Sequence, residues 1–180
     1  MSALPPEQID VIRTHLELRN LGALRRSTPP SGSASVTREQ LTAQAYRALY
    51  LLVGERWQWR DRLRLSDEEL DSYLARSDVH VWVLRVDERI AGYFELQRQG
   101  TQVEIMYFGL APEFVGRGLG GWLLGRAAEE AFALGATRIT LHTCTLDSAN
   151  ALPNYLARGF VIVREERYAH TLDSAAVRSQ

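Results

Sequence analysis

Hydrophobic and polar side chains alternate along the segment Val11–Arg19, close to the N-terminus. A period of two residues is typical of a strand that buries one of its faces. The segment that follows, Ser27–Ser35, is rich in Ser, Pro and Gly and shows neither the strand period nor the helix period. The pattern therefore predicts a half-buried first strand and then a surface loop.

Two amphipathic helices are expected after this loop. Residues Thr37–Gln40 match a capping box, and the helix predicted to begin there runs to about Gly54 with one apolar face. Ser66 is the expected cap of the second helix. The acidic residues 67–69 fall in its first turn, where the helix dipole stabilises negative charge.

From His80 the pattern changes to three short strands joined by turns of hairpin length, over residues 81–86, 90–98 and 103–110. This predicts an antiparallel meander. The remaining elements are expected to be a helix, a strand, a helix and a strand, which cover Gly116–Gly135, Thr137–Thr145, Ser148–Arg158 and Phe160–Tyr168 in turn. Together they predict one mixed α/β (α+β) domain over residues 1–180. Its core would extend from about residue 11 to 170, and the polar tail 171–180 is expected to fray.

Residue usage then excludes several function classes. All 21 basic residues are arginine, so neither a Schiff-base lysine nor a phosphate loop with its lysine is present. The net charge of −1 argues against a basic surface for nucleic acid or an anionic membrane. Cys144 is the single cysteine, which excludes an internal disulfide and fits a reducing cytoplasm.

Three further patterns are not found in the sequence. The N-terminus shows no targeting signal, and no apolar run approaches the ~20 residues needed to cross a bilayer. The four histidines are scattered without ligand spacing, so no metal is expected. The sequence thus favours a cytoplasmic protein with no nucleic-acid or membrane partner.

The most informative stretch is Glu104–Gly120, where a strand leads through a Pro-marked turn into a glycine-rich helix start. Glycines let a ligand approach the backbone, and the free amides of a helix N-terminus attract anions such as a pyrophosphate. Gly116, Gly118 and Gly121 also satisfy the dinucleotide pattern GxGxxG. However, five residues separate them from the strand, and no acid follows at the required distance. A glycine-rich turn that only permits close packing is the remaining alternative.

The segment Val115–Gly120 resembles the signature of the GCN5-related N-acetyltransferase (GNAT) superfamily, Gln/Arg-x-x-Gly-x-Gly/Ala, although Val115 stands where that family has Gln or Arg. A second similarity is Ala151, then Tyr155 four residues later, then Gly159–Phe160. The resemblance covers about Val79 to Tyr168. It implies a mostly antiparallel sheet with helices on both faces, whose fourth and fifth strands splay apart at a bulge, expected here near Gly109.

The resemblance also implies acetyl-CoA (coenzyme A) as cosubstrate. The residues it assigns to coenzyme A binding are Phe108, Gly109, Leu110, Val115, Gly116, Arg117, Gly118, Leu119, Gly120, Gly121, Asn150 and Tyr155. Tyr155 would also donate a proton to the departing thiolate. Glu104 matches the position of the general-base glutamate in part of the family, and Glu95 is the substitute candidate. His142 and Cys144 face one side of their strand and are expected to be structural.

Trp57, Trp59 and Tyr107 are the expected acceptor-binding residues, because aromatic faces attract cations. The favoured function is acetyl transfer to a primary amine of a small molecule or a peptide. A catalytically silent acyl-CoA-binding module, transfer to a hydroxyl and transfer of a longer acyl chain remain open. The chain is expected to be a monomer or a homodimer.

Overall fold

The structure is a computed structural model that describes residues 8–171. Its sheet has seven strands in the order β2-β3-β4-β5-β6-β1-β7. The strands are β1 (Gln8–Leu18), β2 (Ala34–Glu39), β3 (Val79–Val86), β4 (Arg89–Gln99), β5 (Gln102–Leu110), β6 (Arg138–Cys144) and β7 (Val161–Thr171). The helices are α1 (Ala43–Gly54), α2 (Asp67–Leu74), α3 (Leu119–Ala133) and α4 (Ala151–Ala157). Short 3₁₀ turns lie at Leu21–Ala23, Glu55–Trp57, Asp61–Arg64 and Pro112–Phe114.

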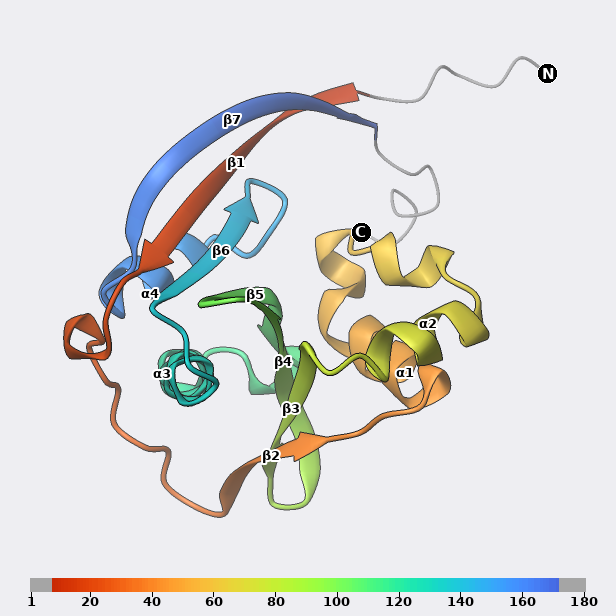
Figure 1. The fold of residues 1–180 in the computed structure, drawn as a ribbon, viewed down its shortest axis with the longest axis horizontal. Coiled ribbons are helices and arrows are strands. Elements are labelled where there is room, and N and C mark those ends of the chain that lie inside the picture. Colours follow the sequence, from red (N-terminus) through yellow and green to blue (C-terminus); the bar gives the residue numbers. More distant parts are fainter. Residues whose placement is uncertain (1–7, 172–180) are drawn as a thin grey trace.

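Neighbouring strands are antiparallel except β5 and β6, which run parallel. These two strands pair only where Gln102–Glu104 lie beside Arg138–Thr140, and beyond these residues they separate (Figure 1). The mixed sheet and the splay of the two strands that the family resemblance implies are therefore confirmed. The fourth and fifth strands of the family correspond to β5 and β6 here, because β2 adds one strand at the edge of the sheet.

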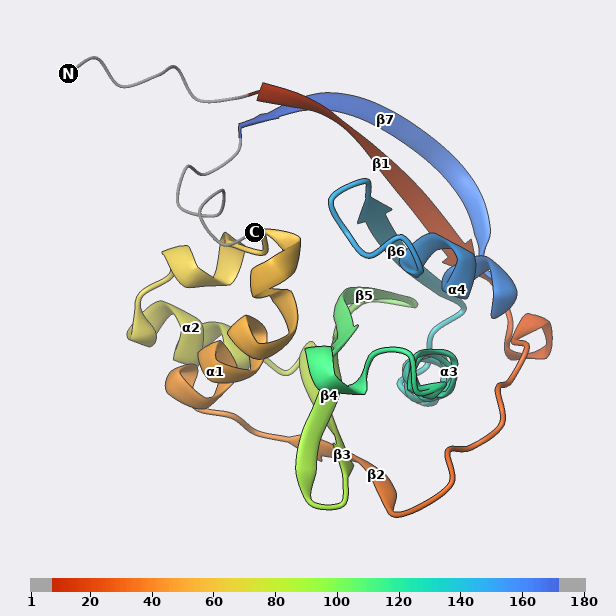
Figure 2. The ribbon, with the colours of Figure 1, turned by 180° about the vertical axis from the view of Figure 1, so that it is seen from behind.

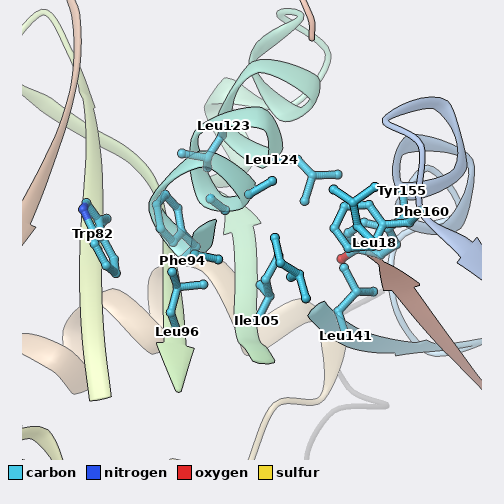
Figure 3. Close-up of a cluster of buried hydrophobic side chains, with 14 of the residues drawn as sticks. Leu18, Trp82, Phe94, Leu96, Ile105, Leu123, Leu124, Leu141, Tyr155 and Phe160 are labelled. Carbon is cyan, nitrogen blue, oxygen red and sulfur yellow. The ribbon is translucent and has the colours of Figure 1, made fainter. Parts of the chain in front are cut away.

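Helices cover both faces of the sheet, as expected. Helices α1 and α2 lie against one face, and α3 and α4 lie on the other (Figures 1 and 2). On the α3 face, Leu123 and Leu124 pack over Phe94 and Ile105 (Figure 3). Side chains alternate between the two faces of a strand. Val81, Val83 and Tyr93 therefore point to the other face, where they pack against α1.

The capping box predicted at Thr37–Gln40 is wrong. Most of these residues belong to β2, which pairs antiparallel with β3 and places Thr37 opposite Val83. Helix α1 begins later, with Thr42 as the N-cap whose side chain accepts a hydrogen bond from the amide of Ala45. The loop expected at Ser27–Ser35 accordingly ends at Ser33. At Ser66 the capping box is present as predicted.

The bulge expected near Gly109 lies elsewhere. Gly109 pairs in register with Tyr93, whereas the register shifts where Glu95 faces Tyr107 and Leu96 faces Ile105, which leaves Met106 as the extra residue. Two helices also start later than predicted. The helix predicted from Gly116 begins at Leu119, and the helix predicted from Ser148 begins at Ala151. In both cases turn residues precede the first helical residue.

The ends of the chain lie partly outside the described residues. Strand β1 starts at Gln8, before the predicted Val11, and β7 extends to Thr171. Of the tail expected to fray, residues 172–180 are not described. Over residues 8–171, none of the helices combines the length and the apolar character needed to span a bilayer.

Candidate active site

A cavity of about 700 Å³ opens where β5 and β6 separate. One wall is the stretch of β5 beyond Glu104, and the opposite wall is β6 from Leu141 onward with the loop that follows it. The glycine-rich turn before α3 and the inner face of α4 close one end. The segment after α1, Trp57–Asp61, forms the other end. The splay of the sheet thus creates a cleft that joins the glycine turn to a cluster of aromatic residues.

The glycine-rich turn leaves the start of α3 without a side-chain cap. Gly116 and Gly118 have φ angles of 82° and 75°, in the left-handed region that side chains other than glycine rarely adopt. No atom lies within 4 Å of a Cβ built on either residue, so the backbone conformation and not the space requires glycine. The uncapped amides of this 15-residue helix, together with its dipole, form a site for an anion.

Helix α4 places Tyr155 on the cavity wall near this turn. Its ring is 7% exposed and packs edge-on against Phe108 and Phe160, with centroids 6.1 and 6.3 Å away. The hydroxyl oxygen points toward Leu141 (Figure 3) and makes no hydrogen bond within residues 8–171. Burial, and to a smaller extent the charge of Asp147, raise the pKa of Tyr155 above its ordinary value. The phenol therefore stays protonated and can donate a proton into the cavity.

The aromatic end of the cavity is built around Trp59. Its ring lies 5.5 Å from that of Tyr50 and 5.0 Å from that of Tyr107, between centroids. A Cβ on Gly54 would come within 2.1 Å of Trp59 Cε3, so glycine is required there for the ring to pack. Trp59 thus belongs to the packing beneath α1 as well as to the cavity wall. Trp57, also at the cavity, contacts only Arg56 among the aromatic and cation–π pairs of the described residues.

Asp147 connects the two sides of the splay. Its Oδ2 accepts hydrogen bonds from the Thr143 hydroxyl at 2.7 Å and the Cys144 amide at 2.9 Å. Its Oδ1 lies 3.5 Å from the Trp59 indole nitrogen, across the cavity. Burial raises the pKa of the Cys144 thiol, and the charge of Asp147 adds to this effect. At neutral pH the thiol is therefore protonated and a poor nucleophile.

The two candidate carboxylates differ in their surroundings. Glu95 is fully buried and accepts hydrogen bonds from Tyr46, Tyr73 and Arg62. Glu104 lies on the paired part of β5, with its side chain 25% exposed and its Oε1 3.5 Å from Nδ1 of His142. Glu104 is not in the wall of the cavity, whereas His142 is.

Comparison with known proteins identifies the family. Residues 46–160, more than half of the chain, match the family model described as "Acetyltransferase (GNAT) family". The chain belongs to the GNAT acetyltransferase family. Members of this family use acetyl-CoA as the acetyl donor. No curated protein matches the chain.

Solved GNAT structures share the fold. A GCN5-related N-acetyltransferase from Kribbella flavida has a TM-score of 0.64 at 17% identity, over 90% of this chain and 58% of its own. A functionally unknown conserved protein from Staphylococcus epidermidis has a TM-score of 0.65 at 17% identity, over 90% and 61%. An aminoglycoside acetyltransferase from an uncultured soil metagenomic sample has a TM-score of 0.58 at 15% identity, over 69% and 86%. The first two are longer than this chain, and identities this low establish the fold alone.

Within the GNAT fold, most of the residues expected at the site lie on one cavity. Its wall includes Trp57, Trp59, Tyr107, Phe108, Gly109, Leu110, Val115, Gly116, Gly120, Asn150 and Tyr155. Arg117, Gly118, Leu119 and Gly121 belong to the glycine turn and the first turn of α3 but not to the wall. Arg117 is exposed, with its guanidinium 5.0 Å from the Phe114 ring centroid.

Sequence reasoning missed Asp147 in this GNAT cavity, and it named His142 only as a structural residue. Asp147 directly follows the predicted strand 137–145, in a Thr-Leu-Asp-Ser turn. An Asp that accepts hydrogen bonds from neighbouring backbone amides is a recognisable turn signal. For His142, only the alternation along its strand indicates which face it occupies. The partner across that face comes from β5 and has no local signature.

Proposed function

We propose that the chain is an acetyl-CoA-dependent N-acetyltransferase that moves the acetyl group directly to a primary amine. The observation that carries the proposal is a single cleft with three parts. An uncapped helix N-terminus lies at one end, a protonated Tyr155 is in the wall, and an aromatic cluster lies at the other end. These parts suit a diphosphate, a thiolate leaving group and a cationic acceptor in that order.

The residues at the glycine turn fit coenzyme A. The amides of Leu119–Gly121 would bind the pyrophosphate, and Arg117 adds an exposed positive charge beside them. Beyond Glu104, no strand within residues 8–171 pairs with the edge of β5 that faces β6. Backbone groups of Phe108 and Leu110 on this edge can therefore bond an extended pantetheine arm, in the manner of an added strand.

In this proposal Tyr155 donates its proton to the sulfur as the thioester bond breaks. Its raised pKa keeps the phenol protonated, and its hydroxyl has no other hydrogen-bond partner among residues 8–171. Glu104 lies outside the cavity wall, 3.5 Å from Nδ1 of His142, which does line the cavity. The acceptor itself would lie against Trp57, Trp59 and Tyr107, whose rings favour a cation on an apolar or aromatic body.

The proposal further includes a cytoplasmic location, a monomer or homodimer, and no nucleic-acid or membrane partner. The net charge of −1 and the single cysteine support these points. The decisive experiment follows free-thiol release from acetyl-CoA over a panel of 2-phenylethylamine, an amino acid, an aminoglycoside and a peptide. Thiol release that depends on an amine supports the proposal. Coenzyme A binding without thiol release from any amine would indicate a silent binding module.

Replacement of Gly118 by valine should weaken coenzyme A binding by 10-fold or more. A β-branched residue does not adopt the φ of 75° found at this N-cap, so the first amides of α3 would turn away from the pyrophosphate. Arg117→Glu should weaken binding through like-charge repulsion, by ~1 kcal/mol or less because the site is exposed. Isothermal titration calorimetry measures both.

The matched control is Gly125→Ala in the same helix. No atom lies within 4 Å of a Cβ at Gly125, so the variant should fold and bind coenzyme A normally. Wild-type affinity in both Gly118→Val and Arg117→Glu would exclude the glycine turn as the pyrophosphate site.

Trp57→Ala should raise the KM for the amine acceptor while the KM for acetyl-CoA and the Tm stay close to wild type. Loss of one cation–π contact of ~0.5–2 kcal/mol corresponds to roughly 2- to 30-fold in KM. Trp59→Ala should lower the Tm as well, because this ring packs on Tyr50, Tyr107 and Gly54. Unchanged acceptor KM in Trp57→Ala would remove Trp57 from the pocket.

A further inference from the structure

Four titratable side chains form a row across β5, β6, β1 and β7, on the sheet face away from α3. Oε1 of Glu104 lies 3.5 Å from Nδ1 of His142, and the rings of His142 and His15 are 5.7 Å apart between centroids. Nε2 of His15 lies 3.0 Å from Oε1 of Glu166. Of the four strands in the row, β6, β1 and β7 lie away from α1 and α2 (Figure 1).

Of these four residues, only His142 reaches the wall of the cavity. Its side chain is 39% exposed, against 25% for Glu104. Its Nδ1 faces the carboxylate, so Nε2 is the ring nitrogen on the far side. Nε2 has no hydrogen-bond partner within residues 8–171.

We propose that His142 is the base that takes the proton from the acceptor ammonium, and that Glu104 acts through it as a positioning residue. The inference rests on the proposed function. With its Nδ1–H toward Glu104, the neutral imidazole of this cavity-lining residue keeps its Nε2 lone pair available to accept a proton. The carboxylate also stabilises the imidazolium that forms.

Three carboxylates near the cleft are less suited to the task. Glu95 is buried and already accepts hydrogen bonds from three side chains. Asp147 already accepts hydrogen bonds from the Thr143 hydroxyl, the Cys144 amide and the Trp59 indole. Asp61 is exposed and accepts from Tyr107 at 3.4 Å, on the acceptor side of the aromatic cluster.

The proton balance of the step is complete. The ammonium gives one proton to Nε2 of His142, and the resulting amine attacks the thioester carbonyl carbon with its lone pair. The C–N bond forms and the C–S bond breaks, with the electron pair leaving on sulfur. The Tyr155 hydroxyl gives its proton to the thiolate and regains the second proton of the amine nitrogen. The proton on His142 then passes to solvent.

His142→Gln should lower kcat/KM for the amine by ~10²–10⁴-fold at neutral pH, the range typical of a lost general base. The defect should shrink as the pH approaches ~10, because the amine then arrives unprotonated. Glu104→Gln should cost less, on the order of 10-fold, because it removes only the group that positions the imidazole. The matched control is His15→Gln, which removes a histidine outside the cavity and should keep at least half of the wild-type rate.

NMR of the imidazole resonances provides a readout that needs no acceptor. The chain has four histidines, so His142→Gln assigns the resonance directly. In Glu104→Gln the ring resonances of His142 should change in chemical shift, because an amide replaces the carboxylate that faces Nδ1. His15 lies beside this ring and is unchanged in the variant, as are Arg13 on β1, Cys144 on β6, and Arg164 and Glu166 on β7, on the same face of the sheet.

The outcomes separate this inference from the proposed function. If the wild type releases thiol with an amine and His142→Gln keeps that rate and its acid limb, the inference is wrong and the function stands. If Glu104→Gln alone abolishes the acid limb, Glu104 is itself the base. If the wild type neither binds acetyl-CoA nor releases thiol with any amine of the panel, the proposed function is wrong and the inference falls with it.

Discussion

Tyr155→Phe is expected to lower kcat by ~10²–10⁴-fold with little change in acetyl-CoA affinity, because only the protonation of the leaving thiolate loses its donor. The ring keeps its edge-on contacts with Phe108 and Phe160, so the fold should be unaffected. Single-turnover kinetics and calorimetry measure the two quantities separately.

The same residue predicts the alkaline behaviour of the wild type. Burial raises the pKa of Tyr155, so kcat should stay level through pH ~10, where an ordinary tyrosine would ionise and cease to donate. A control is Tyr168→Phe, which removes a phenol in the same cavity but far along β7 and should leave kcat within a few-fold of wild type. A wild-type rate for Tyr155→Phe at every pH would remove Tyr155 from the mechanism.

Arg62→Leu should destabilise the fold by ~3–5 kcal/mol, because it leaves the buried Glu95 without its cation. For a chain of this size that loss corresponds to a fall in Tm of roughly 6–20 °C. Arg62 also lies 4.0 Å from the Tyr73 ring centroid and 5.1 Å from that of Tyr107. Activity should therefore fall at temperatures where the variant is still folded.

Two further variants test the cause. Arg76→Leu removes the same residue type from an exposed pair with Asp78 and should change the Tm little. Glu95→Gln in the Arg62→Leu background removes the uncompensated charge and should recover part of the loss. Equal Tm values for Arg62→Leu and Arg76→Leu would show that the buried pair contributes nothing to stability.

The parts of the site that are contiguous in sequence could be predicted without the structure. The turn with Gly116 and Gly118 opens a helix, and Ala151 and Tyr155 lie one turn apart on the next helix. Gly159 is explained by local conformation together with packing: its φ is 101°, and a Cβ there would come within 2.2 Å of the Ala23 carbonyl oxygen. Such features can be predicted from periodicity and from the positions of glycines, because the features depend on the backbone conformation of residues that are close in sequence.

The edge strand β2 shows where local signals are insufficient. Thr37–Gln40 satisfies the composition of a capping box, yet six backbone pairs with β3 hold residues 34–39 as a strand. The bulge at Met106 is similar, because its position is set by the register between β4 and β5 and not by a glycine. Register is a property of two strands together, so one strand's sequence does not determine it.

From its sequence alone, this protein could be assigned a mixed sheet with helices on both faces, a glycine turn for an anion and a tyrosine beside it. Only the tertiary structure brought Asp147 within 3.5 Å of Trp59, 88 residues away in the chain. It also placed His142, and not Glu104, on the wall of the cleft. These contacts arise because β5 and β6 pair over three residues and then separate, and this long-range pairing leaves no periodic trace in either strand.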